Sequence, residues 1–295
     1  METAPAATFD LVLATVARTS ELDAFLDSLE RQRFRDFRVL VVDQNDDDRL
    51  DRVLERRRDL SVVHLRSARG LNRARNVGLA AASAELVAFP DDDCAYPPDL
   101  LERVVNRFAG EPRLDGVTGR TAEPGGATSD RWPVKPRILD LRTVWHGGNS
   151  ASLFLRRDLV ERLGRFDEAI GFGSGNPWEL ADEIDLLVRA IQSGATLEQD
   201  PSFVVHHAVR RETFVEERLR LKRVGAGVGY VLGKNRVATP VLVRRLVNPL
   251  GGIALSLARL DLQRARLHAT TLRWRLVGYW GGRAERARSS ANSSA

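Results

Sequence analysis

The sequence predicts an α/β fold in which a mostly parallel sheet has helices on both faces. Apolar, β-branched runs alternate with amphipathic segments over residues 9–109, and this alternation is typical of a parallel sheet. The length of 295 residues fits one large domain with an appendage. Hydrophobic residues make up 43% of the chain, which is enough for a packed core. The single Cys excludes a disulfide scaffold and a Cys-based zinc site.

Each strand and helix of this region follows from a local pattern. Residues 9–16 are apolar and β-branched, as in a buried strand, and the helix after them begins near Thr19 or Ser20, either of which can cap it. Further strands are predicted at 37–43, 61–67 and 85–93, and further helices at 48–58, 72–83 and 97–109. Ligands of such sheets bind beyond the carboxyl ends of the strands, so we expect the functional site at that edge.

The pattern is less regular after residue 110. Residues 120–137, which are rich in Gly, Pro, Ser and Thr, and the Gly-rich residues 171–178 are predicted loops, and a strand followed by a helix is expected between them. A further helix is predicted at 179–193 and a further strand at 203–207. The predicted parts are a main domain over 1–210, a basic amphipathic helical extension over 211–288 and a disordered tail over 289–295.

Charge is distributed unevenly along the chain. Residues 1–205 have a net charge of −8 and residues 206–295 have +13, although the whole chain has only +5. Within 240–280, apolar residues fall at helical spacing with Arg on the other face, as in a helix that lies on an anionic membrane. A basic extension packed on the main domain or on a second subunit is the open alternative. The aromatic residues are too few and too clustered for a stacking platform, so we expect no nucleic acid as partner.

Three adjacent carboxylates, Asp91 to Asp93, end the predicted strand ELVAFPDDD. They repel one another, which costs stability unless a cation is bound there. Asp91 and Asp93 can turn to the same side and share Mg²⁺ or Mn²⁺, and such an ion can hold a diphosphate. The alternative is a solvated acidic turn.

Two more polar segments lie at the expected edge. Asp43 ends a strand, where its carboxylate can accept a hydrogen bond from a base N–H or a ribose hydroxyl, or can cap a turn. Gly70 precedes a helix whose N-terminus favours anions, and Arg73 or Arg75 can add a charged contact to a phosphate. The sequence contains neither a Walker loop nor a dinucleotide fingerprint after the first strand.

The acidic pair Asp182–Glu183 follows a Gly-rich loop near the start of a predicted helix. Either carboxylate can act as a general base, and the alternative is a role in complementing the helix dipole. His206 and His207 close the last predicted strand, where each can be a metal ligand or a structural histidine.

The order of these motifs resembles the inverting glycosyltransferase family 2, whose members have a GT-A fold. The resemblance covers about residues 8–210, from a strand ending near Thr15 through GLNRARNVGL, ELVAFPDDD and GGNSASLFLRRDLVERLGRFDE to DEIDLLVRAIQSG. Each motif is weak, but together they occur in the family's order and spacing. The resemblance implies a GT-A catalytic domain with a Rossmann-like, mixed and mostly parallel sheet, followed by the C-terminal helical extension.

The resemblance also implies roles for individual residues. Asp91 and Asp93 resemble the outer members of the family's D-x-D metal motif, and His206 resembles a histidine that some members add, with His207 as the alternative. The acidic pair resembles the one that supplies the catalytic base, but its order is reversed here, which favours Glu183 and leaves Asp182 as the second choice. The donor-binding residues that it implies are Thr15, Arg18, Asp43, Arg75, Asp92 and, beside Gly148, Asn149.

These implications predict an inverting glycosyltransferase that depends on Mg²⁺ or Mn²⁺. It would move a sugar from a nucleotide-diphosphate sugar to a hydroxyl of a glycan or lipid-linked acceptor, in cell-envelope or exopolysaccharide synthesis. Trp178 and Trp132 can each stack on a sugar or pack in the protein, and Trp178 is assigned to the acceptor side. A sugar-phosphate nucleotidyltransferase and a non-enzymatic scaffold that binds a membrane or a partner are the alternatives.

The sequence also bears on location. The N-terminus METAPAATFD lacks the basic start and apolar run of a signal peptide, and no run of about 18 uncharged apolar residues predicts a transmembrane helix. The single Cys agrees with a reducing compartment. We therefore expect a cytoplasmic protein, with peripheral attachment of 240–280 to the inner face of the plasma membrane and a homodimer as open possibilities.

Overall fold

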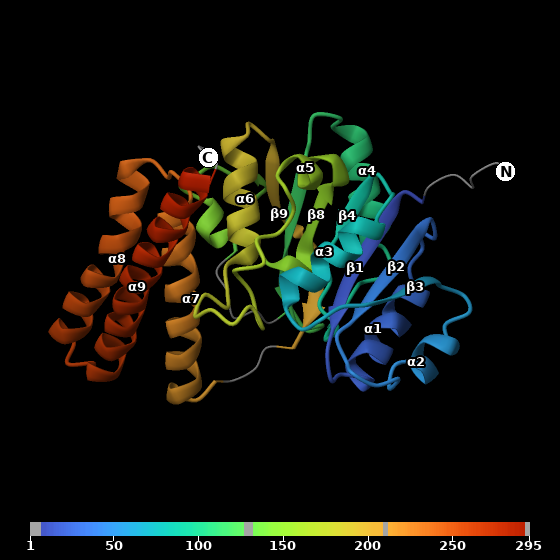
Figure 1. The fold of residues 1–295 in the computed structure, drawn as a ribbon, viewed down its shortest axis with the longest axis horizontal. Coiled ribbons are helices and arrows are strands. Elements are labelled where there is room, and N and C mark those ends of the chain that lie inside the picture. The colour runs from blue at the N-terminus through green and yellow to red at the C-terminus, as the bar shows by residue number, and fades with distance from the viewer. Residues whose placement is uncertain (1–6, 127–131, 209–211, 293–295) are drawn as a thin grey trace. The chain divides into compact units, whose positions relative to one another are not determined.

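The computed structural model describes residues 7–126, 132–208 and 212–292. The chain divides into two compact units, and each is described by itself (Figure 1). Unit 1 contains residues 1–166 and 190–209, and unit 2 contains residues 167–189 and 210–295. The division at 209–210 lies next to the predicted one, but 167–189, predicted within the first domain, groups with the helical part.

Unit 1 is built on one mixed sheet, which contains nine strands in the described residues, in the order β3-β2-β1-β4-β8-β6-β9-β5 with β7 paired to β9. The strands are β1 (Phe9–Thr15), β2 (Phe37–Asp43), β3 (Ser61–Arg66), β4 (Leu86–Ala88), β5 (Cys94–Ala95), β6 (Gly116–Ala122), β7 (Arg137–Ile138), β8 (Leu153–Arg156) and β9 (Leu197–His207). Strands β1 to β4 are parallel, and β8 is antiparallel to both β4 and β6. The predicted mixed α/β fold is confirmed.

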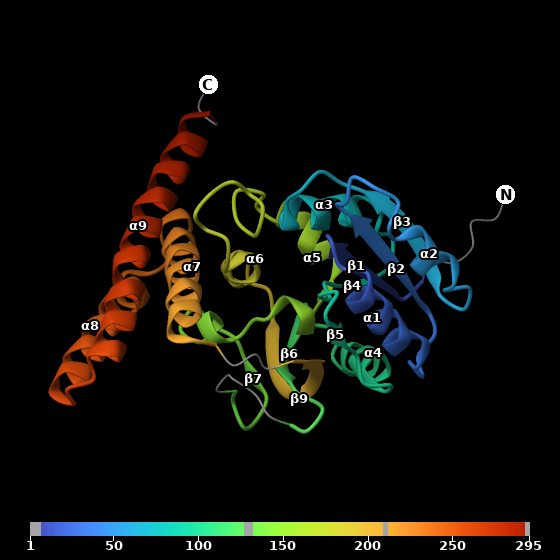
Figure 2. The ribbon, with the colours of Figure 1, turned by 90° about the horizontal axis from the view of Figure 1, so that it is seen from below.

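Helices cover both faces of this sheet (Figure 2). The helices of unit 1 are α1 (Ser20–Glu30), α2 (Asp51–Glu55), α3 (Leu71–Ala81), α4 (Leu100–Gly110) and α5 (Arg157–Arg162), with the end of α6 (Asp182–Gln192), which begins in unit 2. Apolar residues of α1 and α4 share one core with Leu11 and Leu13 of β1. Helix α3 covers the other face, because a Cβ added at its Gly78 would lie 2.4 Å from Val12 of β1. The alternation of strand side chains explains why successive residues meet different helices.

Unit 2 contains α7 (Phe214–Lys234), α8 (Thr239–Ala258) and α9 (Leu262–Asn292), together with the first part of α6. A capping box between Thr213 and Glu216 begins α7. Glycines let α7 approach α9 closely, since a Cβ added at Gly229 would lie 2.1 Å from the Arg275 carbonyl oxygen and one at Gly233 would lie 2.1 Å from that of Tyr279.

The structure differs from the sequence prediction at several places; for example, β9 begins six residues before the predicted strand 203–207. Strand β6 occupies part of the predicted loop 120–137, and β4 ends at Ala88 because Pro90 cannot continue the ladder. Helix α9 continues to Asn292, so residues 289–292 of the predicted disordered tail are helical, and 293–295 lie outside the described residues.

One helix in the described part of the chain, α8, is long and apolar enough to cross a membrane by length and composition alone. Its mean hydropathy is 1.3, and 11% of its most apolar window is buried. The sequence analysis expected no such segment because Arg244 and Arg245 interrupt the apolar run. Two charged residues in an otherwise apolar helix are compatible with either a spanning or an interfacial position.

Candidate active site

The predicted donor residues meet at the carboxyl ends of β1, β2 and β4. Thr15 and Asp43, the last residues of β1 and β2, are direct partners in the parallel register. Strand β4 pairs with the other side of β1, and the chain reaches Asp91 three residues after it. Parallel strands end on the same edge of the sheet, so the topology brings the acidic triplet beside Thr15.

The middle carboxylate of the triplet is held by β1 and by the turn after it. Thr15 Oγ1 donates a hydrogen bond to Asp92 Oδ2 at 2.6 Å, and Arg18 Nη1 donates to Asp92 Oδ1 at 2.6 Å. The same Arg18 nitrogen lies 2.6 Å from Asp93 Oδ2. Burial raises the pKa of Asp92, while the hydrogen bonds of Thr15 and Arg18 act to lower it. Arg18 therefore forms ion pairs with two of the three neighbouring carboxylates.

The third carboxylate meets a histidine from β9. His207 Nε2 lies 3.2 Å from Asp93 Oδ1, and β5, which follows the triplet, pairs Cys94 with His207. This interaction raises the pKa of His207 and lowers that of Asp93. Successive side chains of a strand point to opposite faces, so His206 cannot make the same contact. The structure thus brings His207, rather than the favoured His206, to the triplet.

The first carboxylate faces a buried arginine from α3. Arg75 Nη2 lies 3.7 Å from Asp91 Oδ1, and Ser150 Oγ lies 3.4 Å from the same oxygen. Arg75 is 1% exposed, and its guanidinium carbon lies 5.2 Å from the centre of the Phe166 ring. Arg73, the alternative from the sequence, is exposed. The buried Arg75 is therefore the cation that this helix directs toward the triplet.

Asp43 is fully buried and has several partners. It accepts hydrogen bonds from the backbone N–H and the side-chain amide of Asn45 at 2.8 and 2.7 Å. His64 Nε2 and Arg66 Nη1, both from β3, each lie 3.1 Å from its other oxygen. The sequence analysis missed this pair, although two polar residues at alternate positions of an apolar strand are a signal for one polar face.

Asn149 begins a short 3-10 helix, Ser150–Ser152, and its Oδ1 accepts a hydrogen bond from the Ala151 N–H at 2.9 Å. The cap fixes the turn that carries Ser150 to Asp91. Because the side-chain oxygen has this local role, a direct contact of Asn149 with a donor stays a prediction.

The donor set at this edge fits a divalent ion that is shared with a phosphate ligand. Asp91 and Asp93 offer carboxylate oxygens, and His207 adds an imidazole beside Asp93. No group of three or more His, Cys, Asp or Glu side chains that could hold a metal occurs within the described ranges. Mg²⁺ is commonly held by one or two carboxylates together with substrate phosphates, so an all-protein cage is not required.

The predicted base pair lies in unit 2, at the start of α6. Ala181 has a φ of 80°, a left-handed conformation that sets the sharp entry into the helix. Asp182 is 5% exposed, whereas Glu183 is half-buried. A carboxylate that is in contact with solvent can reach an acceptor hydroxyl more readily than one that is enclosed.

One turn further along α6, Asp185 is the centre of a buried ion cluster. It is 1% exposed and accepts hydrogen bonds from Lys234 Nζ at 3.0 Å and from the Asn235 amide at 2.9 Å, both at the end of α7. Arg189 Nε donates at 2.9 Å, and Lys234 also reaches Asp167 at 2.6 Å. Burial acts to raise the pKa of Asp185, but Lys234 and Arg189 lower it below its usual value. This cluster ties the start of α6 to α7.

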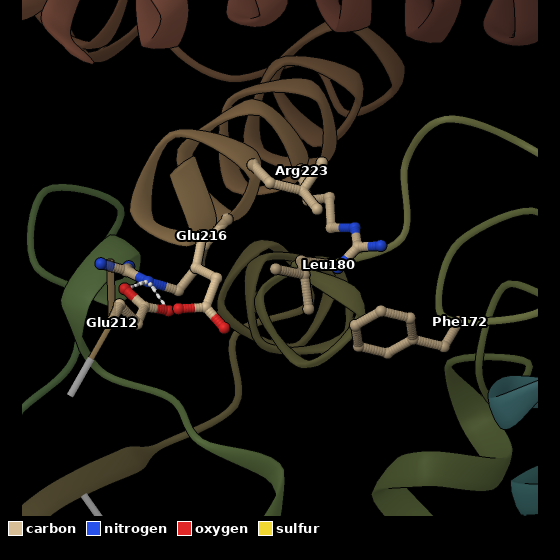
Figure 3. A pocket seen from close by; sticks show the side chains of 7 residues that line it. Phe172, Leu180, Glu212, Glu216 and Arg223 are labelled. Carbon is tan, nitrogen blue, oxygen red and sulfur yellow. Dashed lines mark hydrogen bonds and ion pairs between the residues drawn. The ribbon is translucent and has the colours of Figure 1, made fainter. Parts of the chain in front are cut away.

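A pocket of about 430 Å³ lies in unit 2 beside the start of α7 (Figure 3). Leu180, two residues before Asp182, lines it together with Phe172, which is 45% exposed. Apart from Leu219, its remaining wall is charged, and Arg220 donates to Glu212 at 2.8 and 2.9 Å. The lining residues are Phe172, Leu180, Glu212, Glu216, Leu219, Arg220 and Arg223.

Trp178, predicted on the acceptor side, does not line this pocket. Its ring stacks on that of Tyr230 in α7, with centroids 4.9 Å apart and planes 20° apart. A Cβ added at Gly281 of α9 would lie 2.3 Å from it. These contacts give Trp178 a packing role within unit 2, and a contact with the acceptor stays a prediction.

A mixed, mostly parallel sheet covered by helices and followed by a C-terminal helical region defines an α/β protein with a GT-A-like fold. The chain belongs to glycosyl transferase family 2: the model of this family matches residues 10–167, more than half of the chain.

Curated relatives agree with the family. The pre-mycofactocin glycosyltransferase of Mycobacterium tuberculosis is 29% identical, over 52% of this chain and 33% of that protein. The uncharacterized glycosyltransferase EpsJ of Bacillus subtilis is 28% identical, over 54% of this chain and 51% of that protein. The chain thus spans about a third to half of the length of these relatives.

Solved structures show the same fold at low sequence identity. The mannosyltransferase PcManGT from Pyrobaculum calidifontis, in complex with GDP-Man and Mn²⁺, has a TM-score of 0.66 and 20% identity, over 91% of this chain and 87% of that one. S. aureus TarS 1–349 in complex with UDP-GlcNAc has a TM-score of 0.56 and 13% identity, over 89% of this chain and 91% of that one. The likeness confirms the GT-A-like fold.

Proposed function

We propose that this protein is an inverting, metal-dependent glycosyltransferase that moves a sugar from a nucleotide-diphosphate donor to an acceptor hydroxyl. The observation that supports this most is the acidic triplet at the sheet edge, with Arg18, Arg75 and His207 around it, in a chain of family 2. Opposite charges gathered at the carboxyl edge of an α/β sheet suit a metal–diphosphate group.

The donor side of the proposal uses residues of unit 1. Asp91 and Asp93 would hold Mg²⁺ or Mn²⁺, with His207 as the imidazole in place of His206, and the ion would supply positive charge to the leaving diphosphate. Arg75 provides a fixed positive charge without needing to move. Asp43, whose orientation Asn45 and β3 restrain, would accept a hydrogen bond from the nucleoside. Two fold neighbours bind GDP-Man and UDP-GlcNAc, which supports a donor of this class.

The acceptor side uses residues of unit 2. Glu183, or Asp182 as the second choice, would take the proton of the acceptor hydroxyl, and the acceptor oxygen would bond to the anomeric carbon. The bond from that carbon to the diphosphate breaks, and its electron pair leaves with the diphosphate. Attack from the opposite face inverts the configuration. The greater exposure of Glu183 supports it as the base.

The pocket beside α7 is our candidate for acceptor binding. Phe172 offers an exposed ring for a sugar face, while Glu212 and Arg220 offer hydrogen-bonding groups, a combination that suits a glycan.

We further propose a cytoplasmic enzyme of cell-envelope or exopolysaccharide synthesis, bound to an anionic membrane through 240–280. The net charge of +13 over residues 206–295 supports such a partner.

The test is metal-dependent stabilisation by the donor. We expect one of the UDP-, GDP- or dTDP-sugars to raise the melting temperature only when Mn²⁺ or Mg²⁺ is present, because a ligand that binds only the folded state stabilises it. Asp93→Ala should abolish the metal-dependent part of the shift, and Asp99→Ala, on α4 outside the edge, is the control. Equal shifts with chelator and with metal would contradict the metal role. Release of pyrophosphate instead of a nucleoside diphosphate would indicate a nucleotidyltransferase.

A further inference from the structure

Helix α8 leaves most of its apolar surface without a partner in the described part of the chain. Within unit 2, α9 lies between α7 and α8, so α8 has helix packing on one side (Figures 1 and 2). Large apolar side chains on α8 and the turn after it are exposed, and Leu260 reaches 88%. The exposed set is Val243, Val247, Leu250, Leu255, Leu257 and Leu260. Val243, Val247, Leu250 and Leu257 fall on one face of α8 by their helical spacing, and an exposed apolar face of this kind usually marks a binding surface.

A proline inside α8 gives a second observation. Pro249 has no N–H, so the carbonyl of Arg245, four residues earlier, loses its partner within the helix. Arg275 Nη1 of α9 donates to that carbonyl at 2.7 Å. On a surface in contact with water, a solvent molecule could replace this bond. Where water is scarce, a neighbouring helix must supply the donor, as in proline-containing membrane helices.

Three arginines lie close enough to one another at this carbonyl for their positive charges to interact. Burial, together with the positive charges of Arg275 and Arg244, lowers the pKa of Arg245 to about 10. Burial also lowers the pKa of Arg275. In the residues that the structure describes, Arg275 has no ion pair, and its buried Nε has no hydrogen-bond partner. Desolvated cations next to one another favour an anion between them.

The composition selects the class of partner. Residues 239–283 contain eight arginines and one acid, Asp261. A second copy of this surface would bring like charges together, and a nucleic acid would leave the apolar side chains in water. An anionic bilayer offers phosphates to the arginines and acyl chains to the apolar face.

We propose that α8 lies in the interface of an anionic bilayer, with its exposed apolar side chains among the acyl chains and Arg245 and Arg275 bound to lipid phosphate. This inference rests on the membrane partner of the proposed function and adds which helix enters the bilayer interface and which two arginines bind the lipid phosphate. Arg275 has two roles here: Nη1 completes the backbone of α8, and Nη2 faces the phosphate.

The experiment is flotation of the full chain with liposomes of phosphatidylcholine alone or mixed with phosphatidylglycerol. We expect flotation only with the anionic mixture, and a loss of about tenfold or more in partition for Arg245→Gln/Arg275→Gln, since each arginine near an anionic leaflet contributes about fivefold. Arg286→Gln/Arg288→Gln removes the same charge from the far end of α9 and should change partition by about twofold or less. A second variant, Val243→Ser/Val247→Ser/Leu250→Ser, tests the apolar face and should also lower flotation.

Each result has one meaning. Equal flotation on neutral and anionic liposomes, or unchanged flotation of both the arginine and the apolar variants, overturns the proposal. Self-association of the wild type that the apolar variant abolishes would replace the bilayer with a second copy. Metal-dependent donor hydrolysis in lipid-free buffer, measured on the same proteins, should be unchanged by the arginine variant, so a failure of catalysis and a failure of membrane binding are separated.

Discussion

At the sheet edge of unit 1, three adjacent carboxylates meet arginines of the same unit, whereas Arg275 of unit 2 meets a backbone carbonyl and, in the described residues, no carboxylate. The first arrangement is close to neutral but keeps oxygen donors that suit a cation and a diphosphate. The second leaves an excess of positive charge beside an apolar face. The oxygen donors of the first arrangement and the excess positive charge of the second therefore support the different partners that we propose for the two units.

The comparison also separates two halves of the proposed chemistry. Groups that suit the diphosphate belong to unit 1, and the candidate base belongs to unit 2. Unit 2 contains a third kind of charged site, the fully compensated cluster around Asp185, whose role is to fix the helix that carries Asp182 and Glu183. Variants in one unit should therefore affect binding, turnover or stability separately.

The largest effect is expected for Glu183→Gln. The amide cannot accept the hydroxyl proton, so turnover should fall by about 10²- to 10⁴-fold, while metal-dependent donor binding by unit 1 should persist. Steady-state kinetics and donor titration on the same protein measure the two separately. Asp182→Asn is the matched variant: if it loses the turnover and Glu183→Gln keeps it, the base is Asp182. Loss of donor binding in Glu183→Gln would contradict the assignment of donor binding to unit 1 and of the base to unit 2.

Lys234→Met should have the next largest effect. Removing the ammonium leaves Asp185 buried without its closest full charge on α7, which is expected to cost about 3–5 kcal/mol of stability. The free energy of unfolding from denaturant titration measures this. The charge-conserving Lys234→Arg should recover part of the loss.

Lys234→Met/Asp185→Asn is the critical comparison for this cluster. It removes the buried charge together with its partner, so it should be more stable than Lys234→Met alone. If the double variant is instead the least stable, Asp185 is stabilised by Arg189 and Asn235 without help from Lys234. In that case, the hydrogen bond from Asn235 to Asp185, rather than the ion pair with Lys234, would be the main interaction that holds the start of α6 against α7.

Local pattern in the sequence was sufficient for the acidic edge. The apolar strands and their order placed Thr15, Asp43 and the triplet on one edge, because parallel strands leave little freedom for where their ends lie. Local pattern could not distinguish His206 from His207, because only the register of β9 with β5 decides which of the two faces the triplet. Arg73 and Arg75 differ in the same way, through the face of α3 that is buried.

Strand β6 was missed for a physical reason. Residues 116–119 were assigned to no element, and 120–122 fell in the predicted loop. Glycine is uncommon in strands, yet these glycines are present because neighbouring strands approach closely: a Cβ at Gly119 would lie 2.1 Å from the Phe203 carbonyl oxygen, and one at Gly116 would lie 2.4 Å from Leu155. The cluster of Lys234 and Asp185 was equally hidden, because its members are 49 residues apart and each looks like an ordinary surface charge. Contacts of this range require the tertiary structure.

The smallest effect, and the most specific to unit 2, is expected for Gly229→Ala. The new methyl group would lie 2.1 Å from the Arg275 carbonyl oxygen, so α7 and α9 must separate slightly, at a cost of about 1–3 kcal/mol. Gly251→Ala in α8 is the matched control, because no atom lies within 4 Å of the added Cβ and alanine there should stabilise the helix by about 0.5–1 kcal/mol.

The two glycine variants should shift the unfolding midpoint in opposite directions, with donor affinity unchanged in both. This result would show that the packing of α7 on α9 supports unit 2 alone. If Gly229→Ala also lowers donor affinity, donor binding at the acidic edge of unit 1 depends on the packing of α7 on α9. The two units would then not be independent in function.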